Sequence, residues 1–343
     1  MNILFQLGHP AHFYMYRHTI ENLKRDGHKV FIVIRSKDIL EELIEKSGFP
    51  HKNIMTNKKK GKINYCLRLI RAYKTALKFH ADIVIGSTPE VAIIGRLLRR
   101  RSVIMVEDDY CIIPQFDNIA RPFADQVLSP ITCNNGPLEP NTTHYAGFQK
   151  LAYLHPNYFT PNPSIVDQYF PHDETYFLLR FAKLEAFHDI NVHARGISNE
   201  VATKLIEQLS PHGRVYISSE RSLPESLEPY RLSINPLDIH HIMAYASLYV
   251  GDSQSMAVEA AMLGTPSIRF NDFAGRIGVL EELEQTYQLT IGIPADKPDE
   301  LYEHIERLLS TSNLRDTYQQ RRQKMLSEKI DVTAFFTQFI ENL

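Results

Sequence analysis

The chain has 343 residues and a formal net charge of −2 at pH 7, and 43% of its residues are hydrophobic. This length and composition are typical of a globular protein with two domains, each with its own core, and no apolar run approaches the roughly 20 residues that a membrane-spanning helix needs. Three widely spaced cysteines fit neither a disulfide framework nor a zinc site, and the first seven residues are typical of a strand rather than of a secretion signal, so we expect a cytoplasmic protein.

Strands and helices alternate through residues 1–153, which we expect to form an N-terminal domain. The predicted strands are the apolar runs Ile3–Leu7, Val30–Ile34, Asp82–Gly86, Ser102–Val106 and Asp125–Ser129. The predicted helices between them are Tyr14–Arg25, Lys37–Ser47, Ile63–Phe79 and Pro89–Arg99. Strands separated by helices favour a parallel, doubly wound sheet.

Residues 154–174 contain four prolines and are the predicted linker. The alternation restarts in residues 175–343, with predicted strands Tyr176–Phe181, Val215–Ser218, Leu232–Ile234, Leu248–Val250, Ser267–Phe270 and Leu289–Ile293. The predicted helices include Asn199–Leu209, Asp238–Ala246, Pro298–Leu309, Leu314–Leu326 and Val332–Asn342. We therefore expect two Rossmann-like α/β domains facing a central cleft, with the last helix packing on the first domain.

The loop Gly8–His12 follows the first predicted strand, where open α/β sheets bind their ligands. Gly8 permits close approach of a ligand, and His9 or His12 can act as a general base on an acceptor hydroxyl near neutral pH. Two loop histidines bonded to the backbone are the structural alternative. No Gly-x-Gly-x-x-Gly pattern follows the strand, which argues against a dinucleotide-dependent dehydrogenase.

Glu107, Asp108 and Asp109 follow another predicted strand. Adjacent carboxylates repel one another and raise at least one pKa, which suits acid–base chemistry. The alternative is an acidic turn that the nearby run Arg99–Arg101 neutralises.

Arg180 ends the first predicted strand of the second domain, where a guanidinium can bind a diphosphate in bidentate geometry. His188 and Asp189, with His193 after them, follow in a polar loop and are candidate partners of the sugar or phosphate. An ion pair between Arg180 and a surface carboxylate is the alternative.

The segment Gly251–Pro266 predicts a strand end, a tight turn and a helix that Asp252 or Ser253 caps and Gly264 ends. A helix that begins just past a strand's carboxyl end presents N–H groups and a positive dipole end to a phosphate. Ser255 and Glu259 are four residues apart and share one helical face. We expect Glu259 to accept hydrogen bonds from a ribose diol. The alternative is a helix that only packs on the sheet.

This segment resembles the donor-nucleotide signature of the GT-B fold superfamily of UDP-glycosyltransferases and UDP-N-acetylglucosamine 2-epimerases. The loop Gly8–His12, with Arg180 and His188-Asp189, resembles the branch designated domain of unknown function 354. The resemblance implies that Arg180 contacts phosphate, that the first loop lies beside the acceptor, and that Asn271 lies near the donor sugar. It also implies catalytic carboxylates at Glu107 and, less closely matched, at Asp117.

One departure from the epimerases stands out. They carry a histidine just after the strand that Val215–Ser218 represents, and this chain has Ser219-Glu220-Arg221. We therefore expect a metal-independent glycosyltransferase that uses a UDP-sugar, with no cofactor, and a cell-surface polysaccharide, such as lipopolysaccharide, or a glycolipid as acceptor. The alternatives are a UDP-N-acetylhexosamine 2-epimerase and a non-catalytic nucleotide-sugar-binding protein of surface-glycan assembly.

Charge is distributed unevenly along the chain. Residues 1–150 carry 22 Lys and Arg against 14 Asp and Glu, whereas the remainder carries 16 against 26. Within the basic half, residues 58–79 predict a basic amphipathic helix, which suits either peripheral contact with an anionic membrane, at its inner face, or an ordinary solvated helix. No motif for binding nucleic acid accompanies it, so we expect no nucleic-acid partner.

Overall fold

The computed structural model describes residues 1–35, 39–55, 61–182 and 195–343. It divides into two compact units, an N-terminal unit of Met1–Tyr153 with Lys329–Leu343 and a C-terminal unit of Leu154–Glu328. Each unit contains one parallel sheet with helices between its strands, which confirms the expected pair of doubly wound α/β domains. None of the helices in the described ranges is long and apolar enough to cross a bilayer.

The sheet of the N-terminal unit has seven parallel strands in the order β3-β2-β1-β4-β5-β6-β7. The strands are β1 (Asn2–Leu7), β2 (Lys29–Ile34), β3 (His51–Asn53), β4 (Ile83–Gly86), β5 (Arg101–Met105), β6 (Gln126–Pro130) and β7 (Thr142–Tyr145). The connecting helices are α1 (Pro10–Arg25), α2 (Leu40–Ser47), α3 (Lys62–Lys78), α4 (Pro89–Leu98), α5 (Pro114–Ala120) and the 3₁₀ helix η1 (Gly136–Asn141). Because β1 lies between β2 and β4, the strand order reverses between β1 and β4.

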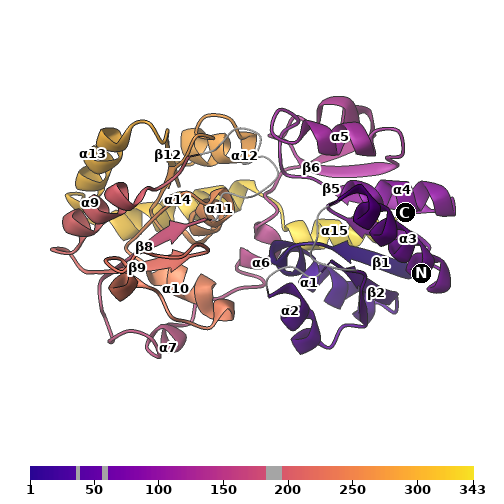
Figure 1. Cartoon of the computed structure of the whole chain (residues 1–343), viewed down its shortest axis with the longest axis horizontal. Helices are drawn as coiled ribbons and strands as arrows, with labels where there is room; N and C mark the ends of the chain where they lie inside the picture. The colour runs from indigo at the N-terminus through magenta and orange to yellow at the C-terminus, as the bar shows by residue number, and fades with distance from the viewer. Residues whose placement is uncertain (36–38, 56–60, 183–194) are drawn as a thin grey trace. The chain divides into compact units, whose positions relative to one another are not determined.

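The last helix of the chain, α15 (Val332–Glu341), belongs to the N-terminal unit and packs against α1 (Figure 1). Its buried face includes Phe336 and Ile340, both fully buried. The Thr337 hydroxyl accepts a hydrogen bond from Asn22 Nδ2 at 3.3 Å, and the Thr333 hydroxyl donates to the carbonyl of Ala152 at 2.8 Å. The end of the chain is thus part of the first core.

The sheet of the C-terminal unit has five parallel strands in the order β12-β11-β10-β8-β9. The strands are β8 (Tyr176–Phe181), β9 (Arg214–Ser219), β10 (Leu248–Gly251), β11 (Ser267–Phe270) and β12 (Ile291–Ile293). The helices are α7 (Pro163–Val166), α9 (Asn199–Leu209), α10 (Ile239–Tyr245), α11 (Gln254–Leu263), α12 (Gly278–Glu281), α13 (Pro298–Leu309) and α14 (Leu314–Glu328), and α6 (Leu151–Leu154) lies where the chain passes between the units. Here the strand order reverses between β8 and β10.

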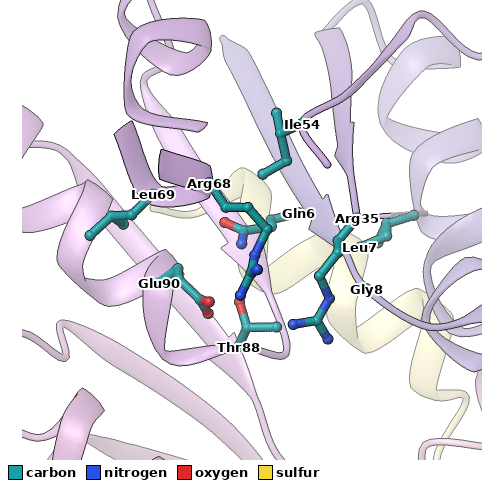
Figure 2. A pocket seen from close by; sticks show the side chains of 9 residues that line it. All are labelled: Gln6, Leu7, Gly8, Arg35, Ile54, Arg68, Leu69, Thr88 and Glu90. Atoms are coloured by element: carbon teal, nitrogen blue, oxygen red, sulfur yellow. The ribbon is translucent and has the colours of Figure 1, made fainter. Parts of the chain in front are cut away.

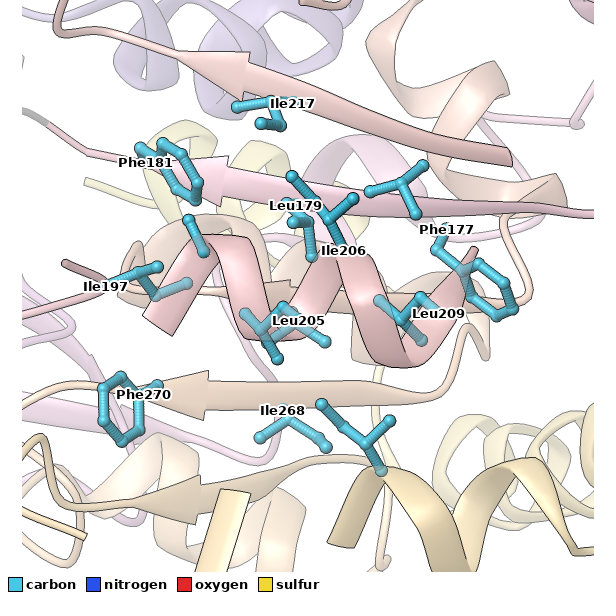
Figure 3. Packing of buried hydrophobic residues seen from close by; sticks show 14 of the residues in the cluster. Phe177, Leu179, Phe181, Ile197, Leu205, Ile206, Leu209, Ile217, Ile268 and Phe270 are labelled. Atoms are coloured by element: carbon cyan, nitrogen blue, oxygen red, sulfur yellow. The ribbon is translucent and has the colours of Figure 1, made fainter. Parts of the chain in front are cut away.

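The core of the C-terminal unit forms where α9 covers the sheet (Figure 3). The helix begins at Ser198, whose side chain accepts a hydrogen bond from the N–H of Val201. Its apolar side chains at helical spacing, Leu205, Ile206 and Leu209, face the buried side chains of β8, β9 and β11. Each such side chain contributes roughly 1.5–3 kcal/mol when it is fully buried, so this layer holds the strands whose ends build the site.

Several predicted boundaries and elements were wrong. Helix α1 begins at Pro10 rather than Tyr14, because proline suits the first helical turn and the His9 side chain caps it. The described residues Leu232–Ile234 do not form the predicted strand; Arg231, just before them, forms an isolated bridge with Ile217. Strands β3 and β7 and the short helix α5 were not predicted. Both strands lie at sheet edges and are polar, so neither shows the apolar run of a central strand.

Candidate functional site

The strand reversal in the C-terminal unit brings several predicted site residues to one edge of the sheet. Arg180 of β8 pairs in register with Gly251 of β10 on one side and with Ser218 of β9 on the other. The N–H of Asp252 then donates to the carbonyl of Arg180 at 3.2 Å. Ligands of open α/β sheets bind outside the carboxyl ends of the strands at such a reversal. We call this edge, from Arg180 to the first turn of α11, the β8–β10 switch point.

Helix α11 begins directly after β10. The Ser253 side chain accepts a hydrogen bond from the N–H of Met256 at 3.4 Å, so Ser253 rather than Asp252 is the N-cap. Gly264 ends the helix with φ of 70°, as predicted. The first N–H groups of a helix have no partner within it, and the positive dipole end adds to their attraction for an anion. The switch point therefore carries a helix end that can bind phosphate.

Ser255 and Glu259 differ in their surroundings. Ser255 is exposed in the first turn of α11, whereas Glu259 is 8% exposed. Nε2 of His240, on α10, lies 3.5 Å from Oε1 of Glu259. Glu259 is therefore held beside a second helix and is not a solvated surface acid.

Arg180 projects from the end of β8 toward β9. Its Nη1 donates to Ser218 Oγ at 2.7 Å, and its Nη2 forms an ion pair with Glu220. Its Nε atom is buried and has no hydrogen-bond partner among the described residues. The Glu220 side chain is 51% exposed. A solvated carboxylate of this kind can be replaced by a ligand phosphate, so both the predicted phosphate contact and the alternative of a surface ion pair find support in the geometry.

Asp252 organises the backbone beside the switch point. Its carboxylate accepts from the N–H of Ala182 at 2.6 Å and from the N–H of Ile197 at 3.2 Å, and it is 2% exposed. Burial raises the pKa of this carboxyl to about 6, although the two backbone hydrogen bonds oppose the rise. Gly196 lets the loop approach, because a Cβ there would lie 2.5 Å from Asp252 Oδ2. Asp252 thus joins both described flanks of residues 183–194, and its predicted ligand contact stays a prediction.

The residues after β11 complete this edge. Asn271 is fully buried, and its side chain donates to the carbonyl of Asp252 at 3.1 Å and accepts from the N–H of Phe273 at 2.9 Å. Asp272 pairs with the guanidinium and the backbone N–H of Arg195. Asn271 therefore supports the turn into α11. Its predicted contact with the donor sugar stays a prediction. The predicted partners His188, Asp189 and His193 lie outside the described residues.

In the N-terminal unit, the loop after β1 carries the two candidate base residues. His9 Nδ1 accepts from the N–H of Ala11 at 3.2 Å, and His12 Nδ1 accepts from the N–H of Gly8 at 3.3 Å. These contacts match the structural alternative of histidines bonded to the backbone. They also fix the proton of each neutral ring on Nε2, which is then a donor rather than an acceptor.

Glu107 is engaged in a partly buried ion pair. Its carboxylate accepts hydrogen bonds from Lys150 Nζ at 3.0 Å and from the N–H of Gln149 at 2.6 Å. The side chains of Glu107 and Lys150 are 13% and 11% exposed. Arg100 and Arg101, two of the three arginines expected to neutralise this acidic turn, form ion pairs with Asp82 and Asp125 instead. Removing either partner of such a pair leaves an uncompensated charge, so replacing Glu107 alone would destabilise this region whatever its chemistry.

Asp117 lies inside the first unit, on α5. It is 1% exposed, and neither carboxylate oxygen has a hydrogen-bond partner within the described part of the chain. Burial, and then the charge of Asp108, raises its pKa to about 7. The sequence pattern assigned a raised pKa to one of the carboxyl groups of residues 107–109; the raised pKa described here is instead that of Asp117, which carries a proton over much of the neutral range.

Sequence reasoning missed the partners of the site. Glu220, Ser218 and His240 were not proposed as members, because each meets its partner only through sheet register or helix packing. A search of the described ranges finds no cluster of three or more His, Cys, Asp or Glu side chains that could hold a metal ion.

Comparisons with known proteins agree with this architecture. The family model described as "Protein of unknown function (DUF354)" matches residues 1–274. No curated protein matches the chain. Among solved structures, Anabaena Alr3699/HepE in complex with UDP and glucose is similar at a TM-score of 0.67 and 16% identity, with 100% of each chain covered.

Two further structures have the same fold. The UDP-GlcNAc 2-epimerase from Neisseria meningitidis bound to UDP-GlcNAc aligns at a TM-score of 0.62 and 10% identity, over 95% of this chain and 100% of the other. The spinosyn rhamnosyltransferase SpnG, complexed with spinosyn aglycone, aligns at a TM-score of 0.62 and 11% identity, over 99% of this chain and 100% of the other. At these identities the likeness concerns the fold alone.

Proposed function

Because the chain belongs to the DUF354 family and has the GT-B fold, we propose that it is a glycosyltransferase that moves a sugar from a UDP-linked donor to a glycan or lipid-linked acceptor. The UDP part of the proposal is supported by the similar structures solved with UDP and glucose and with UDP-GlcNAc. The transfer part is supported by the chemistry of the switch point.

The observation that carries the proposal is the position of α11. Its capped amino end opens directly after β10, beside Arg180 on the neighbouring strand. Backbone N–H groups, a helix dipole and a guanidinium at one sheet edge suit a diphosphate better than any neutral ligand. Glu259 lies farther along the same helix, where a carboxylate can accept hydrogen bonds from a ribose diol.

Sugar transfer needs stabilisation of the departing diphosphate. As the bond between the anomeric carbon and the diphosphate breaks, negative charge grows on the diphosphate oxygen. Preorganised donors at the α11 end and on Arg180 would stabilise that charge without reorganisation. Glu220 would be displaced from Arg180 when the donor binds, since two anionic partners compete for one guanidinium.

On the acceptor side, His9 and His12 are the proposed contacts of the incoming hydroxyl. Because each Nδ1 accepts a hydrogen bond from the backbone, Nε2 carries the proton of each neutral ring. To act as a general base through Nε2, the ring must instead carry its proton on Nδ1 and donate a hydrogen bond from that atom.

Transfer is favoured over epimerisation by two features. Ser219, Glu220 and Arg221 replace the histidine that the epimerases carry after this strand, and Ser219 Oγ donates to the carbonyl of Arg221 at 2.7 Å. Glu107, the better match to an epimerase carboxylate, is held by Lys150. Epimerisation remains the reaction to test against.

We also propose that the outer face of α3 contacts an anionic membrane surface. Four large apolar side chains of this helix are 41–78% exposed: Ile63, Leu67, Ile70 and Leu77. The exposed basic residues Arg71, Lys74 and Lys78 accompany them. Apolar groups flanked by cations complement an anionic bilayer, which suits a lipid-linked acceptor.

A nucleotide-sugar assay tests the proposed reaction. The protein is incubated with UDP-GlcNAc in deuterated water, with and without membrane glycolipid, and both UDP release and deuterium at C2 of the sugar are followed. Transfer predicts UDP release that depends on acceptor and no deuterium at C2. Deuterium incorporation without acceptor would instead establish the epimerase.

A further inference from the structure

The sheet of the N-terminal unit has its own strand reversal, and a pocket lies there. Its lining comes from the end of β1, from the segments that follow β1, β2, β3 and β4, and from α3 and α4: Gln6, Leu7, Gly8, Arg35, Ile54, Arg68, Leu69, Thr88 and Glu90 (Figure 2). Its cavity volume is about 10 Å³, room for one small polar group, within about 300 Å³ of space that includes the open mouth. It occupies the position between β1 and β4 at which open α/β sheets bind ligands. We call it the β1–β4 pocket.

Two arginines from different elements converge on this pocket. Figure 2 shows the side chain of Arg68, from α3, and that of Arg35, which follows β2, both extending toward Thr88. Arg35 follows β2 and packs closely over the first loop, since a Cβ on Gly8 would lie 3.2 Å from Arg35 Nη2. No described carboxylate lies within ion-pair distance of either guanidinium, although Glu90 lines the same pocket.

The position of Arg68 on α3 is unusual for a cation. Helical spacing places it on the side of the buried residues Ala72 and Thr75, whereas the exposed apolar residues Ile63 and Ile70 lie on the opposite face. Lysines and arginines of an amphipathic helix normally lie on its solvated face. A cation on the inner face, directed into a pocket, indicates a binding role.

Buried polar atoms in the pocket lack partners. Gln6 is 7% exposed, and its Oε1 has no hydrogen-bond partner among the described residues; the same holds for Thr88 Oγ1. Thr88 is the N-cap residue of α4, yet its side chain makes no capping hydrogen bond. Buried polar atoms are normally paired, so these two atoms mark places that a ligand's hydroxyl groups can fill.

The charges of the pocket define the ligand. Arg35 and Arg68 contribute two positive charges, and the amino end of α4 adds a partial one, against the single carboxylate of Glu90, which is 7% exposed. The balance suits one negative charge, as on a carboxylate, better than the nearly double charge of a phosphate monoester. The planar guanidinium also matches the two oxygens of a carboxylate.

We propose that the β1–β4 pocket binds the carboxylate of an acidic sugar in the acceptor, with adjacent hydroxyl groups donating to Gln6 and Thr88. This inference rests on the proposed transferase function and names the class of acceptor: a glycan whose receiving end carries a uronic or similar sugar acid.

Binding of small saccharides to the whole protein tests the proposal. Dissociation constants are measured by ligand-observed NMR for methyl glucuronide, neutral methyl glucoside and glucose 1-phosphate. We expect methyl glucuronide to bind at least tenfold more tightly than the other two. Equal binding of the acid and the neutral sugar would overturn the proposal, as would tighter binding of the phosphate ester while UDP occupies the β8–β10 switch point.

Variants assign the effect to the pocket. Arg35→Gln and Arg68→Gln should each weaken the binding of methyl glucuronide about tenfold or more. Arg96 is an exposed arginine at the other end of α4, and Arg96→Gln should leave this binding unchanged. Glu90→Gln should strengthen the binding of methyl glucuronide several-fold, because it removes a negative charge that repels the ligand's carboxylate. A misfolded variant would not show such a gain. Unchanged binding in both arginine variants, or no gain in Glu90→Gln, would contradict the assignment.

UDP affinity, measured on the same samples, separates the two proposals. Loss of methyl glucuronide binding in the arginine variants, with UDP binding intact, supports the assignment to the β1–β4 pocket. A protein that binds methyl glucuronide but not UDP would retain the pocket and reject the transferase.

Discussion

Glu259 of α11 and His240 of α10 lie side by side in the C-terminal unit, with 3.5 Å between Oε1 and Nε2 and side-chain exposures of 10% and 6%. The pair joins helix α11 to its neighbour α10. It holds a carboxylate within the helix whose amino end opens the β8–β10 switch point. The position of Glu259 is therefore set before any ligand binds, which reduces the entropic cost of ordering it on binding.

Replacing Glu259 tests its contact with ribose. Glu259→Gln preserves the shape and removes the charge, and hydrogen bonds to charged groups are worth about 1.5–3 kcal/mol, so we expect UDP affinity to fall about 10- to 100-fold. Isothermal titration calorimetry measures the change. Glu303→Gln, an exposed residue of α13, is the control and should bind UDP like the unaltered protein. Equal affinity in both variants would remove Glu259 from the site.

The ion pair between Arg180 and Glu220 predicts two opposite effects. Arg180→Lys loses the planar fork and should weaken UDP binding about tenfold. Glu220→Gln frees the guanidinium from its competing carboxylate and should strengthen UDP binding several-fold. Titration of both variants with UDP and with uridine separates the phosphate contribution, because uridine should respond to neither. A weaker complex in Glu220→Gln would show that the two residues act together rather than in competition.

Asp117 predicts a dependence of stability on pH. Its pKa of about 7 in the folded protein lies above the ordinary value of 3.8, so the unfolded chain releases this proton first as the pH rises. The contribution of Asp117 to folding is therefore most favourable below pH 4 and falls until about pH 7. Asp117→Asn removes this pH dependence. The free energy of unfolding of the variant, relative to that of the unaltered protein, should therefore be about 2–3 kcal/mol more favourable to folding at pH 8 than at pH 5.

Urea unfolding at the two pH values measures that difference. Asp296→Asn, an exposed aspartate, is the matched control and should show almost no change between them. A pH-independent effect of Asp117→Asn would mean that Asp117 is ionised in the folded state and has a partner.

The two loop histidines predict a separation of binding from turnover. The double variant His9→Ala, His12→Ala should retain the UDP affinity of the unaltered protein, because both residues lie in the N-terminal unit. Its turnover should fall about 100-fold or more, the usual contribution of a positioned acid or base. Turnover equal to that of the unaltered protein would reject these residues as contacts of the reacting hydroxyl.

The apolar face of α3 predicts binding to anionic vesicles. The double variant Ile70→Gln, Leu77→Gln should lower the partition of the protein onto phosphatidylglycerol vesicles about tenfold. Both side chains are exposed in the protein, and each contributes about 1 kcal/mol or more when it enters the bilayer. Leu97→Gln, which removes an equally exposed leucine from α4, should not. Flotation of all three proteins with phosphatidylglycerol and with phosphatidylcholine vesicles measures this. Equal flotation of the double variant and the unaltered protein would remove α3 from the membrane contact.

The alternation of strands and helices was predictable because the central strands are apolar and helices separate them. The capped helix α11 was predictable for a local reason: Ser253, Gly264 and the intervening alanines act within a few residues of one another. The edge strands β3 and β7 were not, since they lack a buried apolar run.

The partners of the site residues could not be predicted, because they are distant in the sequence. Glu107 meets Lys150 across the N-terminal unit, and Arg180 meets Glu220 only through the register of β8 with β9. The half-buried position of Arg68 also depends on which face of α3 packs inward. A sequence that alternates cations and apolar residues through this helix leaves that face ambiguous.

The most direct test of the account follows the amide N–H groups of Gln254 and Ser255, in the first turn of α11, by ¹⁵N NMR during titration with UDP. We predict that both resonances shift together with the side-chain resonance of Arg180, and that all three report one dissociation constant. Resonances that stay in place at saturating UDP would contradict the proposal that this helix end binds the diphosphate.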